Sequence, residues 1–125
     1  MFSGLVGTPF EQLNCAQLVI EVYRRYEIDL PQYEFDDIAI STAMAMRRAG
    51  MIDNITDNDW THIEEPLIPC LIVLRGHSGY NDHLGVYIGN GRFLHSDRRM
   101  GVITNSITDS AWRNRIAGYY KFKRN

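Results

Sequence analysis

Apolar residues recur with the period of an α-helix near the start of the chain. Between residues 13 and 26 they fall on one helical face, at Leu18, Val19, Val22, Tyr23 and Tyr26. Asn14 is a favourable N-cap, because its side chain can accept hydrogen bonds from the free N–H groups of the first turn. The pattern therefore predicts a helix over residues 13–26 with Cys15 in its first turn, and Pro31 marks the end of this segment.

A second helix is predicted over residues 36–49 from the placement of charge. Asp36 and Asp37 suit the positive N-terminal end of a helix, and Arg47 and Arg48 suit its negative C-terminal end. Gly50 follows as a stop. Residues 51–66 are polar and favour no element.

The second half of the chain has the pattern of strands and turns. The short apolar or alternating runs that predict strands are residues 70–75, 83–88, 92–97, 102–104 and 117–123. Gly89, Asn90 and Gly91 separate two of these runs and indicate a hairpin. Residues 106–112 resemble a short helical turn. Helices followed by an antiparallel sheet of about five to six strands predict the α+β class.

Length and composition narrow the class of protein. The chain has 125 residues, 45% apolar and 22% charged, which fits one domain over residues 1–125 and excludes disordered, collagenous and coiled-coil proteins. No apolar run approaches the roughly 20 residues of a membrane helix. The first ten residues lack the basic and apolar regions of a secretory signal. We therefore expect a chain without a membrane span that is made in the cytoplasm.

The charges are divided unevenly along the chain. The net charge is −2, which argues against a general nucleic-acid binder. Residues 1–70 carry 12 acidic and 4 basic side chains, whereas residues 71–125 carry 3 acidic and 9 basic ones. Two readings fit this division: two half-surfaces that attract each other, or a basic wall that faces an anionic ligand.

Two cysteines, Cys15 and Cys70, are too few for a disulfide framework and are expected to be thiols. The helix macrodipole and the free N–H groups of a first turn favour the thiolate, so we expect the pKa of Cys15 to fall. The alternative for Cys15 is a small buried core residue. Cys70, in an apolar strand, is expected to be buried and inert.

A nucleophilic cysteine needs a base, and the base needs a group that orients it. His83 and His95 are the candidates, one on each strand of the hairpin. With a two-residue turn, Gly89 would pair with Arg92, and the two histidines would point to opposite faces of the sheet.

A three-residue loop changes this outcome. Ile88 would then pair with Arg92, and His95 would lie opposite Gly85, on the same face as His83 and one diagonal away. Diagonal neighbours are roughly 7–8 Å apart at Cα, within reach of two imidazoles. Given that loop, His83 can be a base and His95 its orienting residue.

A zinc site is an alternative interpretation of the histidines. His77, His83, His95 and a cysteine could supply zinc ligands, but their spacing matches no known zinc motif. His62 and His77 are expected to lie on loops or at the surface.

Two stretches contain the candidate site residues: residues 14–19, NCAQLV, and residues 83–91, HLGVYIGNG, followed by residues 93–95, FLH. Together they resemble the motifs of the NlpC family of papain-like cysteine peptidases. Residues 7–10, GTPF, resemble the segment that precedes the family's nucleophile. Residues 23–26, YRRY, and residues 112–120, WRNRIAGYY, resemble short members encoded with phage tail-assembly proteins. The resemblance covers most of the chain and is weakest over residues 50–66.

The resemblance implies a papain-like fold, with Cys15 as nucleophile, His83 as general base and acid, and His95 as the residue that orients His83. It implies hydrolysis of an amide in the peptidoglycan stem peptide, typically γ-D-glutamyl to diaminopimelate, without a cofactor or metal. It also implies a phage tail, or delivery to the cell wall, as the place of action, with other tail proteins as partners.

Four residues of the implied site depart from the family pattern. Asn14, Ala16 and Gln17 stand where the family has Asp, Ser and Gly, and Phe10 stands where a Tyr often lends its hydroxyl to the oxyanion. Loss of one oxyanion donor typically costs roughly 10²–10³ in kcat. Tyr33, Tyr80 and Tyr87 are candidates to replace it.

Two alternatives to a wall hydrolase therefore stay open. One is a structural tail-tip domain that keeps the fold without the activity. The other is a related thiol acyltransferase or amidase that acts on a lipid or a small amide, since fold alone does not fix function.

Overall fold

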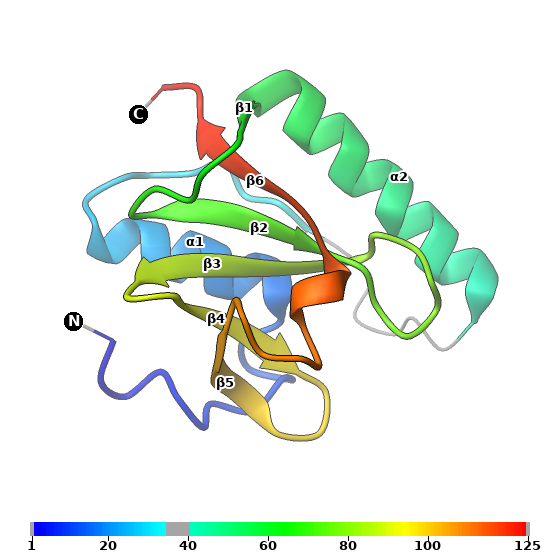
Figure 1. Ribbon diagram of the computed structural model, residues 1–125, viewed down its shortest axis with the longest axis horizontal. Coiled ribbons are helices and arrows are strands. Elements are labelled where there is room, and N and C mark those ends of the chain that lie inside the picture. The colour runs from blue at the N-terminus through cyan, green and yellow to red at the C-terminus, as the bar shows by residue number, and fades with distance from the viewer. Residues whose placement is uncertain (1, 35–40, 125) are drawn as a thin grey trace.

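The computed structural model describes residues 2–34 and 41–124. In this part of the chain, two α-helices accompany a six-stranded antiparallel sheet of order β1-β6-β2-β3-β4-β5 (Figure 1). The strands are β1 (Trp60–Ile63), β2 (Cys70–Leu74), β3 (His83–Gly89), β4 (Arg92–Asp97), β5 (Gly101–Ser106) and β6 (Ile116–Phe122). The expected α+β class, with N-terminal helices on an antiparallel sheet of five to six strands, is confirmed.

The first helix, α1 (Cys15–Arg25), begins and ends where the apolar period indicates. Asn14 is its N-cap, and Cys15 is its first residue. The apolar face is buried against the sheet, and Figure 1 shows α1 in blue behind β2 and β3. Ser96 Oγ, near the end of β4, donates a 2.6 Å hydrogen bond to the carbonyl of Leu13. This bond ties the segment before Cys15 to the sheet.

The second helix, α2 (Thr42–Asp59), differs from the prediction. The predicted start at residues 36–40 lies outside the described residues, and Gly50 does not stop the helix. An exposed glycine inside a helix costs only about 1 kcal/mol relative to alanine. Beyond it, Ile52 and Thr56 continue the buried face that Ala45 begins, and this burial outweighs the cost. Arg48 therefore lies in mid-helix instead of at a helix end.

Two further elements differ from the sequence prediction. The polar stretch around residue 60 contains β1, which pairs with β6 and buries Trp60 against Phe122 and Tyr23. The helical turn expected over residues 106–112 is displaced: the described 3-10 helix is η1 (Arg113–Arg115). Within the described residues, neither α-helix is long and apolar enough to span a membrane.

The hairpin of β3 and β4 combines the two loop geometries considered above. Its tip is a two-residue turn, with Gly89 paired to Arg92. The register then shifts between Tyr87 and Gly89, so that Gly85 pairs with His95. A β-bulge thus restores the pairing that a three-residue loop would give.

The two faces of the sheet have separate cores. Leu84, Val86 and Leu94 face α1 and belong to the larger cluster. On the opposite face, Phe93 packs with Ile72 and Leu74 under the segment that precedes β6. Cys70 is fully buried on β2, as expected, and burial raises the pKa of its thiol to about 11.

Candidate active site

The start of α1 is held by a reciprocal pair of hydrogen bonds around Cys15. The N–H of Gln17 donates to Asn14 Oδ1 at 3.0 Å, and the N–H of Asn14 donates to Gln17 Oε1 at 2.9 Å. This is a capping box, which satisfies two donors that a helix start leaves free. Two of the departures from the family motif therefore form a cap together, and they fix the position of the thiol.

The environment of the Cys15 thiol differs from the expectation of a lowered pKa. The side chain is buried, with 5% of the residue exposed, and burial raises the pKa of the thiol. The charge of Arg48 and backbone hydrogen bonds from Leu84 and Ala16 act in the opposite direction but do not outweigh burial. The helix end is apparent from the sequence, whereas the desolvation that packing against β3 imposes on the sulfur depends on the tertiary structure.

His83 and His95 meet through their rings. His83 Nε2 and His95 Nδ1 lie 3.1 Å apart, a hydrogen-bond distance, with the ring centroids 5.2 Å apart and the planes nearly perpendicular. Pairing of β3 with β4 ends at Gly85 and His95, so His83 lies one diagonal away on the same face. The predicted juxtaposition of the two histidines is therefore present in the structure.

Both histidines are held in their neutral form. Burial lowers the pKa of His83 to about 3, with the neighbouring His95 as the second cause, while the carboxylate of Asp97 acts against the shift. Burial also lowers the pKa of His95, which has no exposed surface. The Trp112 ring packs against both imidazoles, with its centroid 4.5 Å from that of His95 and 6.3 Å from that of His83. Trp112 thus shields the pair from water on one side.

A third polar side chain, that of Asn105, lies next to the two histidines and was not among the residues predicted from the sequence. Asn105 Oδ1, on β5, lies 2.8 Å from His95 Nε2. Asn105 pairs directly with Phe93 across β4 and β5, and it is a diagonal neighbour of His95. The predicted strand over residues 102–104 stopped one residue short, so this contact could not be read from the pattern.

Cys15 and His83 line one cleft of about 710 Å³. Its wall is mixed in charge: arginines come from α2, from the β4–β5 turn and from the segment before β6, and two aspartates face the same space. The charged lining residues are Arg48, Arg98, Arg99, Arg115, Asp82 and Asp97. The cleft brings the thiol of Cys15 and the imidazole of His83 together, and His83 is in turn at hydrogen-bond distance from the buried His95. Such a set can carry out nucleophilic acyl transfer.

The hydroxyl expected from a tyrosine does not reach this cleft. Phe10 lines it, beneath the guanidinium of Arg98 at 5.7 Å from the ring centroid. Tyr33 OH instead donates to Asp59 at 2.7 Å, and Tyr87 OH accepts from the N–H of Gly91 at 2.9 Å. Among the described residues, no tyrosine lines the cleft.

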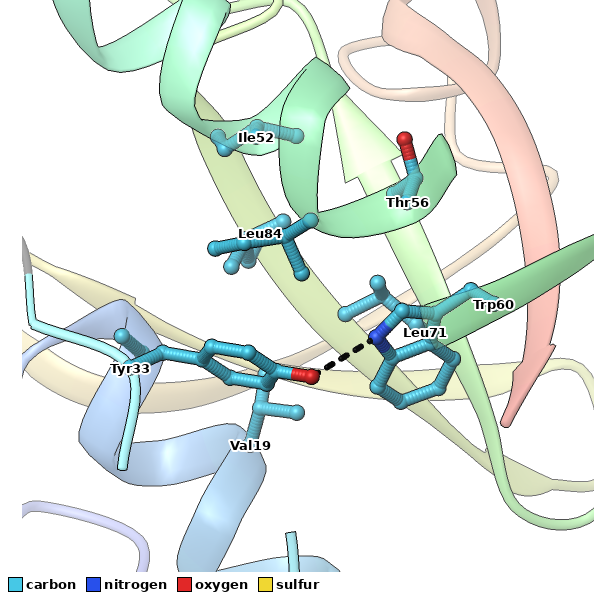
Figure 2. A pocket seen from close by; sticks show the side chains of 9 residues that line it. Val19, Tyr33, Ile52, Thr56, Trp60, Leu71 and Leu84 are labelled. Carbon is cyan, nitrogen blue, oxygen red and sulfur yellow. Dashed lines mark hydrogen bonds between the residues drawn. The ribbon is translucent and has the colours of Figure 1, made fainter. Parts of the chain in front are cut away.

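A second, much smaller cavity lies between α1, α2 and the sheet (Figure 2). Its volume is about 10 Å³, room for about one water molecule. Figure 2 shows Tyr33 and Trp60 at one end, joined by a hydrogen bond from Trp60 Nε1 to Tyr33 OH of 3.3 Å. The remaining labelled side chains are mainly aliphatic. This space is a packing void and not a binding site.

The other histidines occupy exposed positions. His62 lies on β1, stacked edge-on against Tyr120, and His77 lies on the loop after β2, 3.1 Å from the Arg115 guanidinium. Over residues 2–34 and 41–124, no group of three or more His, Cys, Asp or Glu side chains is arranged to hold a metal ion.

Comparison with known proteins gives consistent matches. The model of the NlpC/P60 family matches residues 4–121. Two relatives, each named "Murein DD-endopeptidase MepS/Murein LD-carboxypeptidase", come from Escherichia coli strain K12 and Escherichia coli O157:H7. Each is 25% identical over 114 residues, covering 89% of this chain and 50% of the relative. The chain thus spans about half the length of these curated relatives.

A solved structure shares the fold. It is described as similar to a lipoprotein of the NLP/P60 family from Staphylococcus aureus, and it superposes with a TM-score of 0.58 at 19% identity. The match covers 100% of this chain and 36% of that chain.

Proposed function

Because the chain belongs to the NlpC/P60 family, we propose that it is a cysteine hydrolase that cleaves an amide bond of the peptidoglycan stem peptide. The murein peptidase names of its Escherichia coli relatives support this substrate class. The observation that carries the proposal is that Cys15 and His83 line the same cleft, while the buried His95 lies within hydrogen-bond distance of His83. In this proposal Cys15 is the nucleophile, His83 the general base and acid, and His95 the residue that orients His83.

The resting site holds a neutral pair. Burial raises the pKa of the Cys15 thiol and lowers the pKa of His83, so both effects favour thiol and imidazole over thiolate and imidazolium. Proton transfer from Cys15 to His83 then accompanies attack on the substrate carbonyl. An anionic tetrahedral intermediate forms, and His83 returns the proton to the leaving amine. Water, activated by His83, releases the acyl group from Cys15.

The oxyanion is stabilised at the start of α1 in this mechanism. The backbone N–H of Cys15 lies at the positive end of the helix, where free N–H groups favour a developing negative charge. The guanidinium of Arg48 lines the same cleft and adds positive charge near the sulfur. In this proposal Arg48 supplies positive charge to a site that lacks the hydroxyl missing at Phe10.

The test is digestion of purified muropeptides, read by mass spectrometry. Wild type is compared with Cys15→Ala, with His83→Ala and with the matched control Cys70→Ala, which removes the other thiol. We expect cleavage by wild type and by the control, and none by the two site variants. The mass of the products identifies the bond.

Absence of cleavage by the wild type would be resolved by iodoacetamide labelling of Cys15. Labelling at the same rate in wild type and in His83→Ala would overturn the enzymatic assignment in favour of a structural tail-tip domain, because His83 would then not act as a base toward the thiol. Labelling that depends on His83, without cleavage, would overturn only the substrate and would favour the acyltransferase or amidase alternative.

Delivery by a phage or prophage tail is a further part of this proposal. Its support is the resemblance of residues 23–26 and 112–120 to short tail-encoded members of the family. Detection of the chain in purified virions by mass spectrometry tests it, and its absence from virions of a producing strain would contradict it.

A further inference from the structure

His95 lies at the centre of a row of polar side chains on three adjacent strands. Across β3 and β4, its pair is Gly85, and across β4 and β5 its pair is Ile103. Residues two positions along each flanking strand share its face, which places His83 on one side and Asn105 on the other. Both are within hydrogen-bond distance of His95, at 3.1 Å and 2.8 Å.

The side-chain carbonyl of Asn105 determines the direction of the hydrogen bonds along this row. A carbonyl oxygen such as Asn105 Oδ1 can only accept, so the proton of neutral His95 lies on Nε2. His95 Nδ1 is then unprotonated and accepts from His83 Nε2. His83 carries its proton on Nε2, and its Nδ1 is left as the basic nitrogen.

We propose that Asn105 is a positioning residue that sets the tautomer of His95 and, through it, that of His83. This inference rests on the proposed function, because the nitrogen it leaves basic, His83 Nδ1, is the one that would take the proton of Cys15. The reversed row would place a proton on His83 Nδ1, and His83 could not act as a base toward the thiol.

Burial of His95 strengthens the influence of Asn105 on its tautomer. His95 has no exposed surface, so water does not compete for its ring nitrogens. Phe93 stacks on the His95 ring with centroids 5.0 Å apart, and Trp112 covers its edge. A buried ring nitrogen without a hydrogen-bond partner costs free energy, so His95 adopts the tautomer that matches the partners around it.

The test combines three variants with two readouts. Asn105→Leu removes the acceptor at similar size, and Asn105→Asp keeps an acceptor oxygen. Thr104→Val is the matched control on the same strand, because its side chain alternates to the other face and bonds Arg92 instead. Nitrogen-15 NMR of the imidazoles reports the tautomers, and the rate of Cys15 alkylation at neutral pH reports the base.

The proposal expects His83 and His95 both protonated on Nε2 in wild type, in the control and in Asn105→Asp. In Asn105→Leu, the Nε2 tautomers are expected to be lost. Its alkylation rate, and its kcat where a substrate is known, should fall about tenfold or more with little change in KM, because a wrong tautomer disables the base.

Two results would overturn the proposal. One is a His95 proton on Nδ1 in the wild type, and the other is an Asn105→Leu variant that keeps both tautomers and the alkylation rate. A folded-state spectrum confirms that each variant is intact. Since the NMR readout needs no substrate, failure of peptidoglycan hydrolysis would leave this test unaffected.

Discussion

The pair of His83 and His95 makes the stability of the folded chain depend on pH. In the unfolded chain, His83 has an ordinary pKa of about 6.5, whereas burial and His95 lower its pKa to about 3 in the fold. Between these values the unfolded state binds a proton that the folded state does not, so stability falls as the pH falls. At pH 5, about 1.5 units below the unfolded value, the loss is about 2 kcal/mol.

The other titratable groups of the site determine the pH range in which the effect of the histidines can be observed. Burial also lowers the pKa of His95, so its contribution has the same sign and is lost over the same range. Burial, the largest single cause, raises the pKa of the Asp97 carboxyl, but hydrogen bonds from the backbone N–H groups of Met100 and Arg99, together with the two histidines, outweigh it and lower the pKa. A carboxylate with a lowered pKa loses its contribution only below its ordinary value, so Asp97 acts below about pH 4. The interval from pH 7 to pH 5 therefore reports the histidines.

The assay is urea unfolding at pH 8, 7 and 5, followed by tryptophan fluorescence, for wild type and His83→Gln. Glutamine cannot titrate, but its side-chain N–H₂ can still donate to His95. From pH 7 to pH 5, wild type is expected to lose about 2 kcal/mol more than the variant. Between pH 8 and pH 7 the two should change in parallel. Parallel behaviour down to pH 5 would refute the argument that His83 is kept neutral by its surroundings.

Two further predictions concern the cleft and the hairpin. Arg48→Gln should shift the pH profile of Cys15 alkylation to higher pH, because the charge of Arg48 lowers the pKa of that thiol. The control Arg47→Gln, at the neighbouring exposed position, should leave the profile unchanged. Identical profiles for Arg48→Gln and wild type would contradict the role given to Arg48. Gly85→Ala should destabilise the fold by about 1–3 kcal/mol in urea unfolding, as overpacked sites do. The added Cβ would lie 3.1 Å from both the backbone carbonyl oxygen of Leu94 and the ring of Phe93, so a stability equal to wild type would contradict the close packing at this position.

The candidate site was predictable where local rules apply. The helix start around Cys15 follows from the N-cap and the apolar period, and both are local properties of the sequence. The relation of His83 to His95 follows from the hairpin, although the pattern left two loop geometries open. A β-bulge settled this relation, and bulges have no reliable signature in one sequence.

The remainder of the site depended on contacts between distant segments. Arg48 lines the cleft only because α2 continues past Gly50, and it continues because Ile52 and Thr56 find a core to pack on. Asn105 meets His95 only through the register of β4 and β5. Neither contact follows from spacing along the chain.

By itself, the sequence determined the class of fold, the helix that presents Cys15 and the hairpin that carries the two histidines. These follow from periodicity, capping and turn chemistry, which act within a few residues. The tertiary structure alone decided the protonation of the site. The helix end favours a thiolate at Cys15, but packing of α1 on β3 removes water from the sulfur and raises its pKa. Desolvation is a property of the surrounding packing, so no local pattern encodes it.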